Sequence, residues 1–178
     1  MKPFKSVAVV KYPLELVWPT IRDRLPELVP FLDDIESITV LERAEDADGV
    51  VRLVNLWKAN PRLPAPLASA IPPAALTWID RAEWRPRSHE CHWRIELQCL
   101  PERAQYAGLT SYVAAIGGRG TRITFEGQLD VPERGLAASS PLIEGALAKG
   151  VESVVTTMIP QNFLKLTQAL STFLGAEA

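Results

Sequence analysis

The sequence predicts a single α+β domain in which a curved antiparallel sheet of about six or seven strands packs against one long C-terminal helix. Three observations predict this class: segments that alternate apolar and polar residues fill the middle of the chain, short turns separate them, and an apolar stripe runs along the last third. Short connections join neighbouring strands in antiparallel order, so the middle segments are expected to form a meander. At 178 residues the chain is long enough to bury one substantial core, which predicts one domain over residues 1–178.

The first third of the chain is expected to form a strand, two short helices and a hairpin. The predicted segments are a strand over residues 4–12, a helix over 14–25, a second short helix over 26–32, and strands over 35–43 and 50–59. Pro26 suits the first position of the second helix, because that position needs no backbone N–H. The two strands are joined by a polar segment that ends in Asp48-Gly49, a pair typical of hairpin turns.

A long loop and four further strands are predicted next. Residues 60–75 contain five prolines, a density that cannot continue a central strand, so this stretch is interpreted as a loop. The strands that follow cover residues 76–85, 89–99, 105–116 and 121–131. The Gly-Gly-Arg-Gly segment at 117–120 lacks the Lys-Ser/Thr of a phosphate-binding loop and lies between two strands, so it is interpreted as a turn.

The alternation also predicts which side chains face the interior. Charged residues such as Arg52, Arg94 and Glu126 occupy one parity of these strands, so the other parity is expected to face inward. The inward set is Val51, Leu53, Asn55, Trp57, Leu76, Trp78, Asp80, Ala82, Trp84, Cys91, Trp93, Ile95, Leu97, Ile123, Phe125 and Leu129. This set is mainly apolar, but it includes one amide, Asn55, and one carboxylic acid, Asp80.

The apolar stripe of the last third predicts one helix over residues 141–173. Apolar residues recur there at three- or four-residue spacing, from Ile143 through Met158 to Phe173. Pro141 suits the first helical position, whereas Pro160 is expected to kink the helix. A helix of this length would measure about 50 Å at 1.5 Å per residue, which suits a helix lying across a curved sheet.

The composition excludes some classes of function. The chain has 19 basic and 21 acidic residues and no long run of either sign, so nucleic acid is not expected as a partner. The apolar run at residues 6–10 is too short for a signal-peptide core or a membrane span, which predicts a cytoplasmic protein. Cys91 and Cys99 would lie about 27 Å apart on one extended strand, too far for a disulfide, so free thiols are expected.

The order of these segments resembles the helix-grip fold of the superfamily that contains START lipid-transfer domains, the birch-pollen allergen family, polyketide cyclases and coenzyme Q-binding proteins. The features that carry the resemblance are residues 7–13 leading into Leu16-Val17-Trp18, the Gly49 hairpin, the 121–131 strand after a glycine-rich turn, and the long C-terminal helix. The resemblance covers nearly the whole chain. It implies a hydrophobic cavity between sheet and terminal helix, and so binding of a lipid, sterol, isoprenoid, polyketide or similar molecule.

The inward aromatic and polar residues are the candidate contacts of such a ligand. The candidate ligand-binding residues are Asn55, Trp57, Trp78, Asp80, Trp84, Trp93, Ile95, Tyr112, Phe125 and Met158. The inward tryptophans form either an aromatic wall for a ligand or ordinary core. Asn55 and Asp80 each need a hydrogen-bonding partner on an apolar face, and that partner is either a ligand or a structural group such as a buried water.

Groups that could act in catalysis or bind a metal are sparse. On a strand, the His-Glu-Cys-His segment at 89–92 would turn His89 and Cys91 to one face and the other two residues to the opposite face, so neither a metal site nor a cofactor is expected. With two histidines in the chain, no Ser-His-Asp triad can be placed. Acid–base chemistry would have to use Asp80 and His89, with Tyr112 as a further donor.

The sequence therefore favours a non-catalytic protein that binds or transfers a small hydrophobic ligand, with Asn55 and Asp80 orienting any polar end. One alternative is a cyclase- or dehydratase-type enzyme on a polyketide-like substrate, in which Asp80, His89 or Tyr112 is catalytic. Another is an interaction module whose cavity has collapsed. The 60–75 loop is expected either to form a lid or touch a membrane transiently, or to pack over one end of the sheet. The sequence indicates no oligomeric state.

Overall fold

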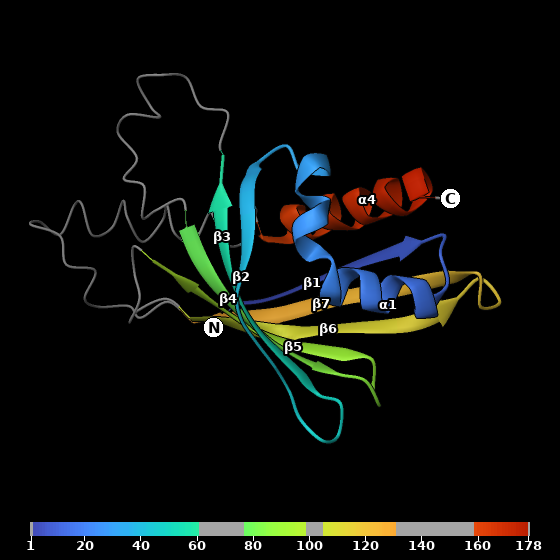
Figure 1. The fold of residues 1–178 in the computed structure, drawn as a ribbon, viewed down its shortest axis with the longest axis horizontal. Helices are drawn as coiled ribbons and strands as arrows, with labels where there is room; N and C mark the ends of the chain where they lie inside the picture. Colours follow the sequence, from blue (N-terminus) through green and yellow to red (C-terminus); the bar gives the residue numbers. More distant parts are fainter. Residues whose placement is uncertain (1, 61–76, 99–104, 131–158, 178) are drawn as a thin grey trace, which may run out of the picture.

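The protein folds into a curved sheet with helices on its inner side, as shown by a computed structural model that describes residues 2–60, 77–98, 105–130 and 159–177 (Figure 1). The elements are β1 (Lys2–Val10), α1 (Leu14–Asp23), the 3-10 helix η1 (Leu25–Phe31), β2 (Ile35–Glu45), β3 (Val51–Ala59), β4 (Thr77–Arg85), β5 (Glu90–Leu97), β6 (Gln105–Ala115), β7 (Gly120–Asp130) and α4 (Ile159–Glu177). The predicted 60–75 loop and residues 141–158 of the predicted C-terminal helix lie outside the described residues. Pro160, where a kink was predicted, is the second residue of α4, so the preceding turn needed to test the kink is outside them too. The helix ends at Glu177, four residues after the predicted end.

All seven strands belong to one antiparallel sheet with the order β1-β7-β6-β5-β4-β3-β2. From β2 to β7 each strand pairs with the next one in the chain, which confirms the predicted meander. The N-terminal strand β1 then pairs with β7 and becomes one edge of the sheet. The predicted α+β class is confirmed.

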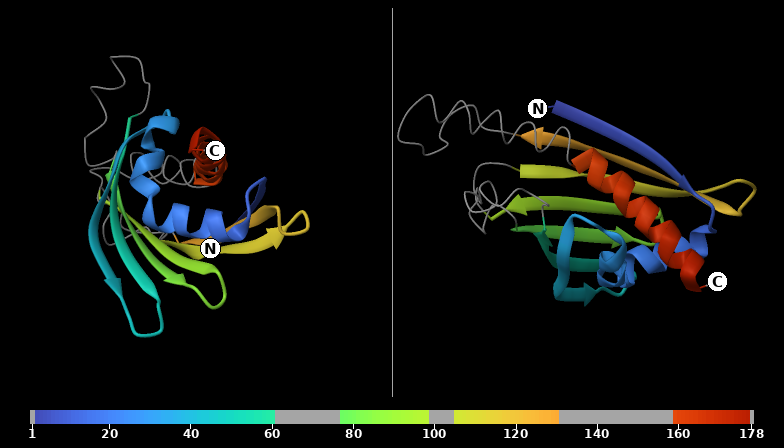
Figure 2. Two further views of the ribbon diagram at one scale, coloured as in Figure 1. Left: turned by 45° about the vertical axis from the view of Figure 1, so that its right-hand side comes forward. Right: turned by 90° about the horizontal axis from the view of Figure 1, so that it is seen from above.

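The helices lie on the concave side of this sheet, which curls around them (Figure 2). α1 contacts β6 and β7, whereas α4 contacts β1 and η1. At the C-terminal end of α4, Phe173 meets Phe31 of η1 with ring centroids 6.1 Å apart, and Arg24 lies over the Phe173 ring at 4.6 Å. The same guanidinium donates to Glu177 at 2.6 Å. These contacts fix the C-terminal half of the helix on the early part of the chain.

The two short helices form where the sequence places proline. The carbonyl of Pro13, just before α1, accepts hydrogen bonds from the amides of Leu16 and Val17, both at 3.0 Å. α1 ends at Asp23, two residues before the predicted boundary, because the chain tightens there into the 3-10 helix η1. Pro26 lies at the start of η1, where a missing N–H breaks no hydrogen bond.

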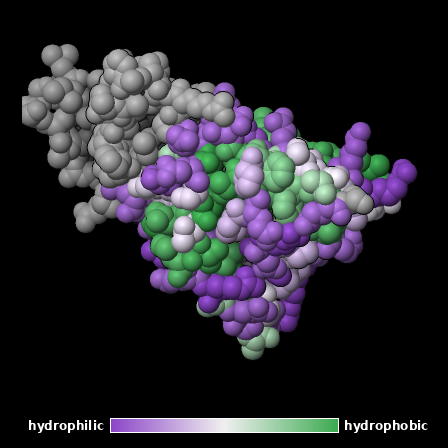
Figure 3. All heavy atoms as spheres, turned by 45° about the horizontal axis from the view of Figure 1, so that its top comes forward, coloured by the Kyte–Doolittle hydropathy of each residue, from purple (hydrophilic) through white to green (hydrophobic). Residues whose placement is uncertain are grey.

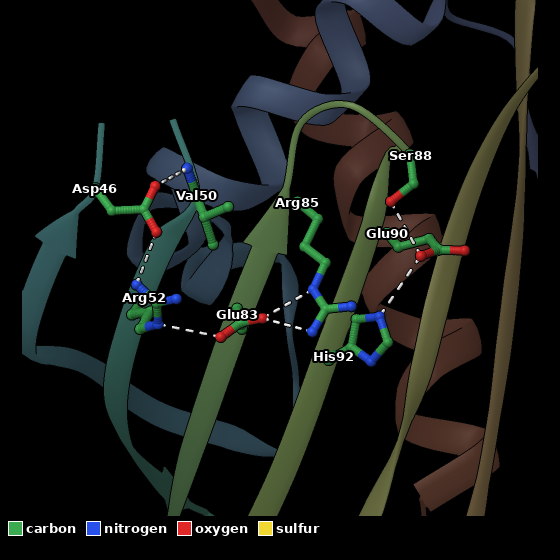
Figure 4. Close-up of polar contacts among 8 residues, drawn as sticks. All are labelled: Asp46, Val50, Arg52, Glu83, Arg85, Ser88, Glu90 and His92. Carbon is green, nitrogen blue, oxygen red and sulfur yellow. Dashed lines mark hydrogen bonds and ion pairs between the residues drawn. The ribbon is translucent and has the colours of Figure 1, made fainter. Parts of the chain in front are cut away.

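The convex face of β3, β4 and β5 carries charged side chains that bond to one another (Figure 4). The Arg52 guanidinium donates to Glu83 and to Asp46, both at 3.1 Å, and Arg85 donates to Glu83 at 2.8 Å. Asp46 also accepts from the amide of Val50 at 3.0 Å, which closes the β2–β3 hairpin. The predicted polar parity of β3 and β4 is confirmed.

The opposite parity faces the concave side, as predicted. Buried residues of this parity are Val51, Leu53, Asn55, Ala82, Trp84, Cys91, Trp93 and Ile123. Three members of the predicted set, Leu76, Leu97 and Leu129, have no side chain among those described. Cys91 is a free buried thiol, and Cys99 lies outside the described residues.

The predicted strand over 89–99 is wrong at its start. His89 belongs to the turn between β4 and β5 and has a left-handed backbone with φ of 51°, so it does not share the strand alternation with Cys91. The turn predicted at 117–120 is confirmed, shifted by one residue: Ile116 to Arg119 form it, and Gly117 and Gly118 supply two of its positive φ angles, 61° and 83°.

Candidate functional site

One row of paired residues crosses the concave face and contains both inward polar side chains. Asn55 pairs with Asp80, Asp80 with Ile95, and Ile95 with Tyr106. Directly paired residues of antiparallel strands project to the same face, so these four side chains stand next to one another. The row begins at the β2 edge with Val40, which pairs with Asn55 and is 41% exposed. The polar residues are thus set between apolar ones, with solvent close to one end of the row.

Asn55 is almost completely enclosed, with 1% of its surface exposed. Its side-chain Nδ2 donates to Oδ2 of Asp80 at 3.3 Å. An ionised carboxylate only accepts hydrogen bonds, so this contact places Nδ2 toward Asp80 and turns Oδ1 away from it. Among the described residues, no partner satisfies that Oδ1 atom. A buried amide oxygen without a partner costs about 1–3 kcal/mol, so the position is unfavourable for stability alone.

Asp80 titrates far from the usual range of a carboxylic acid. Burial raises its pKa to about 6, while the hydrogen bond from Asn55 and the nearby indole N–H of Trp57 act in the opposite direction. Trp57 Nε1 does not reach hydrogen-bonding geometry with that carboxylate or with any other described group. The pKa therefore reflects desolvation without a charged partner, and the carboxyl can exchange a proton near neutral pH.

Two tryptophans lie beside this pair on the same face, two residues further along β3 and β4. The Trp57 and Trp78 rings stack with centroids 5.6 Å apart and an interplanar angle of 18°. Both side chains keep part of their surface accessible, as does Asp80 between them and the middle of the sheet. The ring faces therefore form a partly exposed aromatic surface next to an amide and a carboxyl group.

The centre of the concave face carries a stacked aromatic series. Trp93 stacks on Phe125 at 4.8 Å, and Phe125 stacks on Phe163 of α4 at 4.9 Å, so the series runs from the sheet to the helix. The Trp93 indole donates to Thr110 Oγ1 at 3.1 Å, which fixes the ring. This series contains two predicted ligand contacts, of which Trp93 is buried and Phe125 partly exposed.

The Trp93 ring comes close to the backbone of β6 and β7 at two paired glycines. Gly108 and Gly127 are paired across β6 and β7. A Cβ atom on Gly108 would stand 2.3 Å from the Trp93 ring and 2.2 Å from the carbonyl oxygen of Glu126, so no side chain fits there. Glycine inside a strand often marks such a close approach.

The other end of the concave face is a closed core. Trp18 of α1 meets the rings of Trp84, Tyr112 and His89 edge-on, with centroids 5.1, 5.2 and 5.2 Å away. Trp18, Trp84 and Tyr112 are all buried. Burial, with smaller contributions from the Cys91 and Asp80 charges, raises the pKa of Tyr112 well above 10, so its phenol stays neutral. Trp84 Nε1 is also buried without a described partner, and nothing in the structure explains it.

The structure does not bring Asp80 and His89 together. Asp80 pairs with Ile95 and Arg85 pairs with Glu90, so five residue steps along the strands separate Asp80 from the turn that holds His89. At about 3.4 Å per residue this is about 17 Å. His89 packs its ring on Trp18 in the closed core. The acid–base pair considered from the sequence is therefore not formed, and Asp80 is left with Asn55 and Trp57.

Solved structures match the protein over most of its length, although no family model and no curated protein matches it. A protein from Thermus thermophilus is 18% identical with a TM-score of 0.65, over 99% of this chain and 100% of that one. An aromatase/cyclase from a Streptomyces species is 14% identical with a TM-score of 0.61, over 94% and 93%. Norcoclaurine synthase from Thalictrum flavum is 14% identical with a TM-score of 0.61, over 97% and 86%.

The chain has the helix-grip fold. This confirms the resemblance seen in the order of its segments. At these low identities the likeness concerns the fold, and chemistry has to be argued from the side chains of the site.

Several parts of this helix-grip site were not visible in the sequence pattern. The β2 bulge between Val40 and Glu42 shifts the alternation, so Val40 faces the Asn55 row and Leu41 is the extra residue. Phe4 and Phe163 join the aromatic series from segments far apart in the chain. The glycine pair did leave a signal, since glycine interrupts both strands at paired positions. Met158, a predicted contact, lies outside the described residues.

The described part of the helix-grip chain shows no metal site and no membrane-spanning helix, and some apolar side chains on its helices are exposed. Within it, no three His, Cys, Asp or Glu side chains come together in a way that could hold a metal ion. None of its helices is both long and apolar enough to span a membrane. Apolar and hydrophilic side chains lie next to one another on the face drawn in Figure 3, where green and purple surfaces alternate. The exposed large apolar residues on the helices are Leu16, Phe31 and Leu164.

Proposed function

We propose that the protein binds a small, largely apolar molecule on the concave face of the sheet, between β3–β6 and α4. The observation that carries this proposal is the Asn55–Asp80 pair: an enclosed amide oxygen without a partner among the described residues, and a desolvated carboxyl, both within a row of apolar residues. Such groups orient the polar end of a ligand in sites that are otherwise apolar. A fold selected for stability alone gains nothing from this arrangement.

The apolar part of the ligand would contact the partly exposed side chains near this pair. Trp57, Trp78, Ile95 and Phe125 all keep accessible surface, whereas the tryptophans under α1 do not. Burying a methylene group against such surfaces stabilises a complex by about 0.8 kcal/mol, so an eight-carbon chain is enough for measurable binding. The predicted contacts Trp84 and Tyr112 belong to the closed core and are not part of this surface.

The test is calorimetric titration with n-octanol, a neutral probe, on the wild-type chain and on two variants. Ile95→Trp fills the surface between Asp80 and Tyr106, while Ile79→Trp makes the same change on the opposite face of β4. We expect Ile95→Trp to abolish octanol binding and Ile79→Trp to leave it unchanged, with both variants folded by circular dichroism. If neither octanol nor a charged eight-carbon analogue bound to the wild-type chain, the result would instead support the collapsed interaction module.

One observation favours a second candidate, an enzyme that uses Asp80 as a general acid or base. A carboxyl with a pKa of about 6 can accept and return a proton near neutral pH. Two solved structures with this fold are named as enzymes, an aromatase/cyclase and norcoclaurine synthase. Turnover of a polyketide-like substrate that is lost in Asp80→Asn, with substrate affinity retained, would identify this chemistry. Binding without turnover would leave the non-catalytic proposal in place.

A further inference from the structure

We propose that the polar end of the ligand is a cationic amine, so that the bound molecule is an ammonium group on an apolar body. This inference rests on the proposed function and names the class of ligand that the Asn55–Asp80 pair selects. It is drawn from the kinds of hydrogen-bonding atoms at the pair, the charges around it and the aromatic surface beside it.

The atoms of Asn55 and Asp80 that remain available to a ligand are hydrogen-bond acceptors. Asn55 Oδ1 is buried and has no partner among the described residues, while Nδ2 of the same amide donates to Oδ2 of Asp80. The ionised carboxylate of Asp80 is acceptor-only and has more lone-pair sites than one amide donor can fill. A ligand that meets both residues must therefore bring donors, and an ammonium group brings three and accepts none.

The charges around the pair also favour a cation. Asp80 makes no ion pair with any described residue, and its raised pKa has burial, not a neighbouring charge, as the largest cause. Arg43, whose Cα pairs with Leu53 in the next row of the same face, already donates to Asp23 of α1 at 2.9 Å. A desolvated carboxylate with no counter-ion among the described residues is unfavourable, and a cation that pairs with it reduces that cost.

The aromatic surface next to the pair suits the same group. Trp57 and Trp78 lie two residues beyond Asn55 and Asp80 on the same face, with their rings stacked at 5.6 Å. Indole faces attract ammonium groups and also pack against the methylene groups next to the nitrogen. Carboxylate, amide oxygen and indole faces together thus complement an amphiphilic amine better than a neutral alcohol or a carboxylic acid.

The titratable groups that face Asp80 are few. Among the described residues of the concave side, these are Arg43 of β2 with its partner Asp23 of α1, Cys91 of β5, and the tyrosines Tyr106 and Tyr112 of β6. The charged residues next to Asp80 on β4, Arg81 and Glu83, have the outward parity. Burial raises the pKa of the Cys91 thiol, with a smaller contribution from the Asp80 charge, so it is neutral in this range. Protonation of Asp80 is therefore the change that controls amine binding between about pH 5 and 7, a range that extends about one unit to either side of its pKa.

The experiment compares n-octylamine, n-octanol and n-octanoate, which share one apolar body, by calorimetric titration at pH 7.5. We expect octylamine to bind at least about tenfold more tightly than octanol, and octanoate to bind most weakly. In Asp80→Asn the preference for octylamine should disappear while octanol affinity is retained. Glu83→Gln, which removes a carboxylate from the convex face of the same strand, should leave the preference intact and so excludes a general effect of net charge.

The pH profile gives a second readout. As pH falls below about 6 the free protein binds a proton at Asp80, so octylamine affinity should fall, approaching tenfold per pH unit, while octanol affinity stays level. Asp80→Asn should show a flat profile for both probes. Equal binding of octanol and octylamine would overturn the amine inference and keep the proposed function, whereas failure of all three probes would overturn both.

Discussion

The two ends of the concave face use tryptophan in different ways. Under α1, Trp84 is buried, and its ring packs against the rings of Trp18 and Tyr112. At the other end, Trp57 and Trp78 stack on each other and keep accessible surface next to an ionisable pair. All of the strand tryptophans have the same inward parity, so parity alone does not separate core from site. The element that covers each position makes that distinction.

The largest effect on stability should come from removing a tryptophan side chain from the closed end. Trp84→Ala is expected to lower the free energy of unfolding by about 3–5 kcal/mol, because the surrounding rings cannot collapse into the cavity. Trp57→Ala removes the same side chain from a partly exposed position and should cost less than half as much. Urea unfolding of both variants measures the difference. Equal losses would show that the two ends are both ordinary core.

The next effect concerns the charge at the open end. The pKa of Asp80 is raised to about 6 in the folded protein, above the usual 3.8. The unfolded chain therefore ionises first, and stability is expected to fall as pH rises from about 4 to about 6, by about 3 kcal/mol as an order of magnitude. Above pH 6 the cost stays constant.

This pH dependence is measured as the difference between the wild-type chain and Asp80→Asn. Carboxylates such as Asp23 and Asp46 have lowered pKa values and give slopes of the opposite sign, but they are the same in both proteins and cancel. The variant should gain stability relative to wild type as pH rises from 4 to 6. A difference that does not change over this range would mean that Asp80 is not desolvated in the folded protein.

A third, intermediate effect lies in the region between the two ends. Gly108→Ala places a methyl group against Trp93 and a backbone carbonyl, so it should destabilise the fold by about 1–3 kcal/mol. The matched control is Gly175→Ala on the exposed side of α4, where the nearest atom is the Tyr12 hydroxyl at 3.1 Å and helix propensity favours alanine. Thermal unfolding compares the two. A harmless Gly108→Ala would show that Trp93 does not pack closely against this glycine.

The fold could be predicted from the sequence because its signals are local. Alternation placed the strands within a few residues, and Pro26 and Gly49 marked a helix start and a hairpin. His89 was predicted to be the first residue of a strand, and this is wrong because His89 has a positive φ and belongs to the preceding turn. The strand therefore starts one residue later, at Glu90. The site was harder to predict. Asn55 and Asp80 stood out as polar residues on an apolar face, but their pairing depends on the β3–β4 register, which no local signal in either strand fixes.

The division between closed and open ends could not be predicted at all, because it depends on where α1 packs. Trp18 comes from a segment far away in the sequence and covers Trp84 and Tyr112, leaving Trp57 uncovered by it. No pattern within a strand reports the position of a helix on the sheet. For the same reason the strand pattern did not show that Tyr112 is buried in this core, and its role as a ligand contact stays a prediction.

The smallest effect should come from the convex face. Glu83 accepts hydrogen bonds from Arg85 and Arg52, and the bond from Arg85 is the main cause that lowers the pKa of Glu83. These bonds therefore stabilise the fold above the pKa that Glu83 has in the unfolded chain. The stabilisation is lost as the pH falls through the lower pKa of the folded protein. Because these groups are solvated, Glu83→Gln should cost less than about 1 kcal/mol at pH 7, and less again in high salt. Octanol binding should not change, since Glu83 points away from the proposed site. If Glu83→Gln weakened octanol binding as strongly as Ile95→Trp, the two faces of β4 would be coupled and the ligand would not be confined to the concave side.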